Sequence, residues 1–491
     1  MKHFIFFIVS FVVLFSSYLA ESISLFTLFT ILLLGLCLRR LIAFHRSIYT
    51  IKYFTLIPYT TFSWVLIGQT LSFFAYGQSN GFDQLLNYEL GVGSGGSLDW
   101  IYLPLSMAYI SLFCAFFSIF SAVPFVDVCE KKITLILLNS ISLKSHKLLS
   151  QYTWISYVCG VFLLFLVSAG LLGFKGTQVS ATDPSSSQAL WFPLVRISLS
   201  ILAVIPVFIF KLERKQSFSH LFLIFALLVG IYVSFIIGRR VFIYQLILSL
   251  YSYVWISLAV DNKLPSFKPK VLAISALALY ITPQLMTFFQ YIRTLKLTDL
   301  SLSSLYSRYL EFSQNLELLE RVQDSQVSNY ITRPLLHSVL AQLTQIDDLI
   351  FTGFTDIHDS FLQSLPTLFV GSKTALYGSK SLLVEATGIN IDWISSPPTM
   401  SYLSFGILGF LLYPLLYVTI YYLYSTLVLS ILKLRYSTLI LAIFFTFWLD
   451  TVIQGMPEGS TISYFRGFVI QSFVILLLFM PILFAKTSRR F

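Results

Sequence analysis

Long runs without charge are the feature that most constrains this chain. Residues 4–20, 102–120 and 468–485 contain almost no ionisable side chains. Each run approaches the roughly 20 helical residues that cross a hydrocarbon layer. Only helices and closed barrels pair all their backbone groups in lipid, and barrel strands give short alternating segments rather than continuous apolar runs. The fold class predicted is therefore all-α, a polytopic membrane helical bundle.

Composition excludes a water-soluble globule. The chain is 57% hydrophobic and 11% charged, whereas soluble domains carry about 25% charged residues. Apolar runs recur along the sequence and predict about twelve spans. They lie near residues 4–20, 22–38, 53–77, 101–125, 152–174, 191–210, 219–238, 241–260, 271–290, 401–427, 437–456 and 464–485. The first is interpreted as an uncleaved helix, because Tyr18 fits poorly before a cleavage site that requires small residues.

Three regions follow from this pattern. Residues 1–290 hold predicted spans one to nine, residues 291–400 form one large loop, and residues 401–491 hold spans ten to twelve. The four cysteines fall in or beside predicted spans and none in the large loop, so no disulfide or cysteine metal site is predicted. They are Cys37, Cys114, Cys129 and Cys159.

Basic residues alternate between the connections. Residues 39–52, 131–147, 211–215 and 263–270, with both termini, hold most of the Lys and Arg, while the acids gather in the other connections. Short loops that retain positive charge mark the cytoplasmic side. Both termini are therefore predicted to be cytoplasmic, and the large loop lies on the outer side. The net charge of +10 thus describes orientation in the membrane, and no nucleic acid partner is needed to explain it.

The large loop carries helical patterns of its own. Leucine and aromatic residues recur at spacings of three and four between residues 302 and 319, which predicts an amphipathic helix. A second helix is predicted from Thr332 as N-cap, with Pro334 in its first turn, toward Leu343. A third apolar stretch, residues 361–370, is expected along the membrane surface. A loop of this size is more than a connector, and function is predicted here and on the adjacent helix ends.

Arginines on the predicted outer side need an explanation, since basic residues are normally concentrated in the cytoplasmic loops. They are Arg196, Arg239, Arg240, Arg293 and Arg333. An arginine at the bilayer centre costs roughly 2.5–3.5 kcal/mol on insertion scales. Each can reach lipid phosphate or pair with a carboxylate. Alternatively, several converge on an anionic ligand such as a lipid-linked diphosphate, whose oxygens match the guanidinium fork.

Proton-transfer candidates also lie in the loop. His337 stands four residues after Arg333, on the same predicted helical face, and a histidine accepts protons near neutral pH. Asp347-Asp348 and the stretch Asp356-Ile357-His358-Asp359 could supply a general base or oxygen ligands for Mg²⁺ or Mn²⁺, although solvated acids in turns are the commoner explanation of such a pattern. No cofactor is predicted, since nucleotide-binding and common hydrolase motifs do not occur.

Taken together, these features resemble the bacterial O-antigen polymerase family, the oligosaccharide repeat-unit polymerases. The helix number, the inside termini and the dominant outer loop fit, as does the Gly238-Arg239-Arg240 turn. The passage Ser364-Leu365-Pro366-Thr367 continues to Lys373, although the family commonly has an arginine where Thr367 stands. The run from Ser396 to Tyr402, with Gly406 and Gly409 opening the next span, is similar to the family's return into the membrane.

The resemblance implies a membrane glycosyltransferase of the bacterial inner membrane. Its substrates would be oligosaccharides on undecaprenyl diphosphate, in a helical bundle with a cavity open to the outer leaflet and roofed by the loop. Membrane lipid and a chain-length regulator protein would be partners. In this hypothesis Arg239 and Arg240 hold the diphosphate, with Arg196 and Lys373 as further substrate-binding candidates. Arg293 and Arg333 hold the diphosphate or sugar, His337 is the base, and Asp347 or Asp356 is the reserve base.

Two other functions stay open at this point. An O-antigen ligase uses the same donor, and a lipid-linked oligosaccharide flippase handles the same molecule. A transporter is expected to carry polar residues near the midplane of several spans. Here the midplane of most predicted spans is bare and charge gathers at the outer face, which favours an enzyme.

Overall fold

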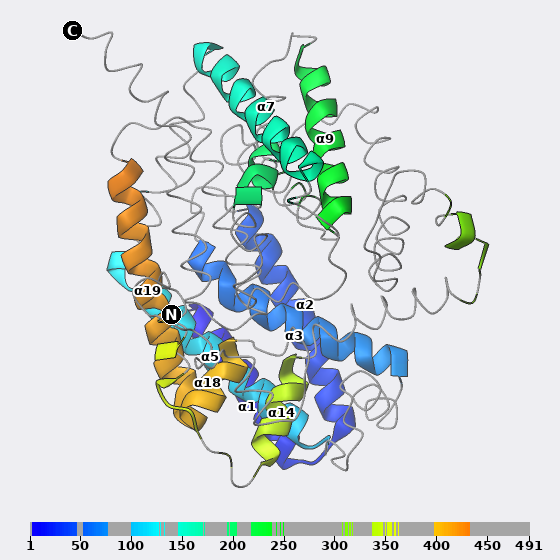
Figure 1. Ribbon diagram of the computed structural model, residues 1–491. Coiled ribbons are helices and arrows are strands. Elements are labelled where there is room, and N and C mark those ends of the chain that lie inside the picture. The colour runs from blue at the N-terminus through cyan, green and yellow to red at the C-terminus, as the bar shows by residue number, and fades with distance from the viewer. Residues whose placement is uncertain are drawn as a thin grey trace. The chain divides into compact units, whose positions relative to one another are not determined.

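The structure is a computed structural model of residues 1–491 (Figure 1). It describes residues 2–46, 53–76, 100–126, 146–169, 218–237, 336–346, 351–355 and 397–432, with single residues and short pieces elsewhere. Across this described part, the secondary structure is almost entirely helical and contains no strand. The predicted all-α class is therefore confirmed there, while the number of about twelve spans is not established.

The described helices follow the predicted spans closely. Helices α1 and α3 match to within two residues, whereas α2 and α7 are longer at the ends predicted to be cytoplasmic. The helices are α1 (Lys2–Leu19), α2 (Ile23–Arg46), α3 (Tyr53–Tyr76), α5 (Tyr102–Ser121), α7 (His146–Ser168), α9 (Phe218–Ile237), α14 (Leu336–Gln345), α18 (Pro397–Phe405), the 3₁₀ turn η1 (Gly406–Leu408) and α19 (Gly409–Leu432). Predicted spans 271–290, 437–456 and 464–485 lie outside the described residues.

Four described stretches are long and apolar enough to cross a membrane. They are Lys2–Leu19, Ile23–Ala43, Tyr102–Ser121 and Pro397–Thr419. The last includes a helix break. These stretches are consistent with a membrane protein.

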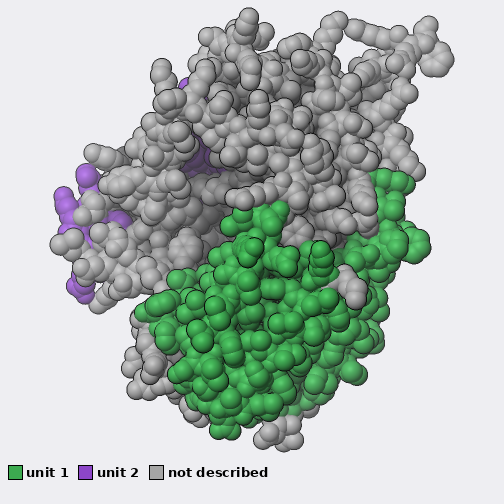
Figure 2. All heavy atoms as spheres, turned by 180° about the vertical axis from the view of Figure 1, so that it is seen from behind, with its two compact units in different colours: residues 1–135, 328–434, 451–466 green, residues 136–327, 435–450, 467–491 purple. Residues whose placement is uncertain are grey.

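The chain divides into two compact units, coloured separately in Figure 2. Unit 1 comprises residues 1–135, 328–434 and 451–466, and unit 2 comprises residues 136–327, 435–450 and 467–491. In unit 1, α5 is the central helix and contacts α1, α3, α14 and α19 (Figure 1). Most of α5 is buried, including Tyr109, Phe113 and Phe117. A segment near residue 100 thus organises segments at both ends of the sequence.

Ring contacts fix the helix directions within unit 1. Phe4 near the start of α1 meets Phe116 near the end of α5, so these helices run in opposite directions. Phe116 meets Phe410 and Phe125 meets Tyr422, so α5 and α19 run in the same direction. The predicted topology requires the same directions, because the first span runs outward whereas the fourth and tenth run inward.

The start of α3 packs beside the start of α1 and the end of α2. His3 Nδ1 and the Tyr59 hydroxyl lie 2.9 Å apart, and the Cys37 thiol donates to the Tyr59 carbonyl at 3.4 Å. Tyr59 is fully buried, and its ring lies 4.8 Å from that of Phe7. The starts of α1 and α3 and the end of α2 therefore meet at Tyr59.

Unit 2 has its own apolar core. Helices α7 and α9 pack together, and the Tyr157 and Phe225 ring centroids lie 5.0 Å apart. Leu163, Val195 and Phe242 are among the side chains buried between them. Residues 195 and 199–203 belong to the predicted span 191–210 and are helical where described.

The tenth predicted span is wrong as a single helix over 401–427. The structure instead has α18, the turn η1 and then α19, which continues to Leu432. The chain leaves the helical region at Phe405 (φ −130°, ψ 11°) and enters the left-handed region at Gly406 (φ 56°). α18 and α19 pack against each other, so the chain folds back at this point rather than bending gently.

Two of the predicted loop helices are partly described. α14 covers the described portion of the helix predicted from Thr332 and extends it to Gln345. It packs on α5 and α18, with Leu340, Ala341 and Leu343 buried. Within the helix predicted over 302–319, described residues such as Ser307, Glu311 and Glu317 are helical, whereas Asn315 is not. The large loop therefore contributes a helix to the packed core of unit 1.

Candidate functional site at the helix break

Most of the predicted site residues lie outside the described residues. This holds for Arg196, Arg239, Arg240, Arg293, Arg333, Lys373, Asp347 and Asp356. His337 is the second residue of α14. Its side chain lies outside the part of the structure that is described. The convergence of these residues on one ligand remains a prediction.

The best-described polar constellation lies at the break between α18 and α19. Gly406 needs its left-handed backbone here, and a side chain would also meet the Phe351 ring, 2.8 Å from an added Cβ. Gly409 touches the Ser401 carbonyl so closely that no Cβ fits between them. These two glycines allow the short helix α18 to fold against the start of α19.

Tyr109 connects the break to the central helix. Its hydroxyl lies 2.8 Å from Ser401 Oγ and 3.4 Å from the Gly406 carbonyl oxygen. The Ser401 hydroxyl donates its proton to the Pro398 carbonyl at 2.7 Å, so Tyr109 is the donor in the shorter bond. All three residues are buried. This arrangement fixes the break against α5.

Residues 351–355, here called the clasp, satisfy the carbonyls at the end of α18. The Thr352 and Gly353 amides donate to the carbonyls of Leu403 (3.1 Å) and Ser404 (2.9 Å). Helix ends leave their last carbonyls without intrahelical donors, and the clasp supplies donors for two of them. The ring centroids of Phe354 and Phe405 lie 5.0 Å apart. The clasp thus joins the large loop to the break through backbone and aromatic contacts.

A histidine–carboxylate pair follows the clasp directly. His358 Nδ1 lies 3.1 Å from Asp359 Oδ1, with the histidine side chain 66% exposed and the aspartate side chain 10% exposed. The His358 amide donates to the Phe354 carbonyl at 2.8 Å, which fixes the pair to the clasp. A carboxylate on Nδ1 orients an imidazole and leaves Nε2 available. Of the stretch Asp356–Asp359, the structure describes these last two residues.

Metal binding finds no support in the described part of the chain. No group of three or more His, Cys, Asp or Glu residues that could hold a metal ion occurs there. The predicted pair Asp347-Asp348 lies outside it.

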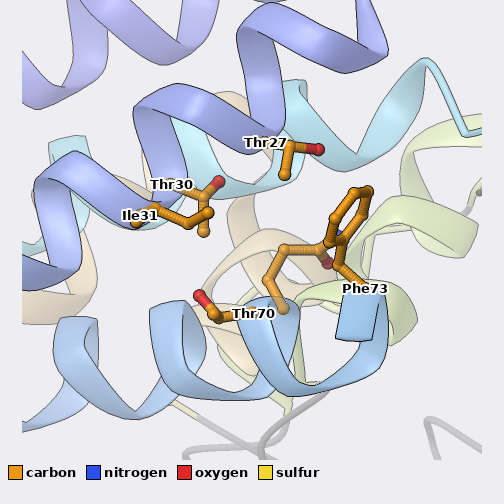
Figure 3. A pocket seen from close by; sticks show the side chains of 6 residues that line it. Thr27, Thr30, Ile31, Thr70 and Phe73 are labelled. Carbon is orange, nitrogen blue, oxygen red and sulfur yellow. The ribbon is translucent and has the colours of Figure 1, made fainter. Parts of the chain in front are cut away.

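A narrow polar groove lies between α2 and α3 (Figure 3). It is lined by Thr27, Thr30, Ile31, Gln69, Thr70 and Phe73. The Thr30 and Thr70 hydroxyls donate to the carbonyls of Phe26 (2.9 Å) and Leu66 (2.7 Å) in their own helices. These two hydroxyl protons are thus used within their own helices.

The sequence interpretation missed the clasp and the break. Gly406 and Gly409 fit the opening of a predicted span, and their apolar neighbours give no signal that the helix is interrupted there. A usable signal is the short uncharged run between Asp348 and Asp356, which contains Gly353 and predicts a tight turn.

Comparison with known proteins adds no family assignment: no family model, curated protein or solved structure matches this chain. The resemblance described from the sequence therefore stands on its own residues.

Proposed function

We propose that this protein is a membrane glycosyltransferase that polymerises undecaprenyl-diphosphate-linked oligosaccharide repeat units at the outer face of the bacterial inner membrane. Both termini are cytoplasmic in this proposal, and a chain-length regulator is an expected partner. The single observation that carries it is the packing of the large loop into the bundle: α14, with His337, contacts α5 and α18, and the clasp bonds to the helix break.

This packing supports an enzyme because it holds loop residues against apolar helices. A lipid-linked sugar has its tail in the hydrocarbon and its diphosphate and sugar at the interface, so its reaction needs polar groups held at that level. Catalytic groups work best on rigid elements, and α14 and the clasp are fixed to α5 and α18. The outer arginines and the family resemblance support the same conclusion.

The proposed reaction joins a lipid-linked glycan to the next lipid-linked repeat unit. An acceptor hydroxyl gives its proton to His337, or to Asp347 or Asp356, and its oxygen attacks the anomeric carbon of the donor. The bond from that carbon to the diphosphate oxygen breaks, and undecaprenyl diphosphate leaves with the electron pair. Arg239 and Arg240, aided by Arg293 and Arg333, would stabilise the developing charge. The diphosphate is a good leaving group, so the step requires no metal.

The test is the surface glycan of a strain that lacks this protein. A polymerase predicts lipid A–core carrying a single repeat unit in the deletion strain, with long chains restored by the intact gene. Loss of every repeat, with lipid-linked polymer accumulating, would instead identify the ligase. Accumulation of single lipid-linked repeats on the cytoplasmic side would identify the flippase. Either of these results overturns the proposal.

A further inference from the structure

Four large apolar side chains at the break are exposed together. Phe351 is 52% exposed, Phe354 67%, Ile407 70% and Leu408 58%. Phe351 packs beside Gly406 and Tyr402, and Phe354 packs on Phe405, so the clasp and η1 form one surface. We call these four residues the apolar clasp surface. Soluble proteins rarely leave such a group facing water.

The position of this surface along the bundle is set by Tyr109. Tyr109 lies about two turns into α5, which corresponds to about 10 Å along the helix axis, and its hydroxyl contacts both Ser401 and Gly406. α5 is itself long and apolar enough to cross a membrane. The break therefore lies inside the length of a membrane-crossing helix rather than above its end, given a hydrocarbon core of about 30 Å.

The charge pattern fits a segment that enters the membrane and leaves again on the same side. Residues 349–355 contain no ionisable side chain, and Asp348 and Asp356 bracket them.

Backbone pairing in the clasp meets the requirement of an apolar layer. Non-helical backbone at membrane depth persists only where its polar groups have partners in the protein. The Thr352 and Gly353 amides donate to α18, the Thr355 amide donates to the Thr352 carbonyl at 3.1 Å, and the His358 amide to Phe354. These bonds give partners to the Thr352, Gly353 and Thr355 amides of the clasp and to two carbonyls at the end of α18.

We infer that the clasp, residues 351–355, forms a re-entrant turn, and that the apolar clasp surface contacts the acyl chains of the surrounding bilayer lipids. The surface continues onto α19, where Leu412, Leu415 and Leu423 are also exposed. The first part of α19, to Thr419, belongs to a stretch that is long and apolar enough to cross a membrane. The bound partner is bulk lipid, and the contact does not depend on the proposed reaction.

Spin-label accessibility in lipid nanodiscs tests this. Cys37, Cys114 and Cys159 are buried and should not react, so Cys129→Ser gives a background for single labels at Phe354→Cys or Ile407→Cys. Oxygen concentrates in hydrocarbon, whereas a nickel chelate stays in water. Both labels are expected to collide several-fold more with oxygen than with the chelate. Leu423→Cys is the lipid-facing control and His358→Cys the water-facing control.

The inference fails if the label at either test position behaves like the one at His358. It also fails if the preference for oxygen appears only after a long-chain polyprenyl diphosphate is added, because the occupant would then be a substrate tail. Each labelled protein is checked by its elution as a folded particle. If the label at Phe354 or Ile407 prevents folding, the accessibility measured at the other position tests the inference.

Discussion

At the scale of single residues, two glycines and a tyrosine determine how the loop meets the bundle. Gly406 supplies a left-handed backbone, Gly409 permits contact with the Ser401 carbonyl, and Tyr109 donates to Ser401. None of these residues is charged. Arginines are the residues that a membrane sequence singles out as candidates for function. The backbone geometry at the break between α18 and α19 depends instead on two glycines and on two hydroxyl groups.

Gly409→Ala is predicted to destabilise the protein by about 1–3 kcal/mol, the usual cost of forcing extra volume into a packed site. The new methyl group meets backbone at Ser401, which cannot rotate away. Thermal unfolding in detergent measures the effect.

Gly35→Ala is the matched control, since nothing lies within 4 Å of its added Cβ in α2. It should be neutral or stabilise by up to about 1 kcal/mol, because Gly lowers the stability of a helix interior. Equal midpoints for the two variants would show that the break does not depend on the close approach at Gly409.

His337→Ala is predicted to lower the turnover of a purified polymerase by about 10²–10⁴-fold, the range for loss of a general base. His337→Gln can form hydrogen bonds but accepts no proton at neutral pH, so it should be nearly as slow. An assay with lipid-linked repeat units separates the cases. High activity of the Gln variant would mean that His337 orients a sugar, and full activity of the Ala variant would transfer the search to Asp347, Asp356 and His358.

At the scale of elements, the clasp acts as a C-terminal cap supplied from a distant segment. Helix C-termini often end with a left-handed glycine, as α18 does at Gly406, but α18 also receives donors from residues about fifty positions earlier in the chain. This cap is a backbone contact, so the identities of the side chains at positions 352 and 353 give little indication of it.

Thr352→Pro is predicted to open the clasp, because proline has no amide proton to donate to Leu403. Hydrogen exchange should show faster exchange of the Gly353 amide than in the wild-type protein. Thr352→Ala keeps the amide and loses only the long 3.5 Å contact to Ser404 Oγ, so its exchange should remain slow. Similar exchange in the two variants would argue against a capping role for Thr352.

The sequence was informative about elements whose cause is local. The apolar runs predict α1 and α3 to within two residues, and the helix-start signal of Thr332 and Pro334 predicts the helix described as α14. The division of the tenth span was missed because its cause is a contact with residues 351–353. No hydropathy pattern around Gly406 reveals that Phe351 occupies the space beside it. The candidate arginines are inferred from their positive charge and from their place on the predicted outer side. They lie outside the described residues, so the structure does not test whether they converge.

At the scale of the whole molecule, orientation follows from charge. The predicted topology places residues 131–147 in the cytoplasm and residues 347–381 outside. Ser381→Cys should react with a membrane-impermeant maleimide in intact spheroplasts, and Lys144→Cys only after permeabilisation, in the Cys129→Ser background. The reverse pattern would invert the orientation and place the large loop, with its candidate base, on the cytoplasmic side.

The central place of α5 also has a consequence for biosynthesis. The hydrogen bond from Tyr109 to Ser401 joins residues 292 positions apart. At a synthesis rate of 5–20 residues per second, the partner emerges roughly 15–60 s after α5. During that interval α5 lacks α18 and α19, and for most of it also α14, so one side of the nascent bundle is unfilled. Premature chain termination before residue 400 would remove α19 and the Ser401 partner of Tyr109, so this side would stay unfilled.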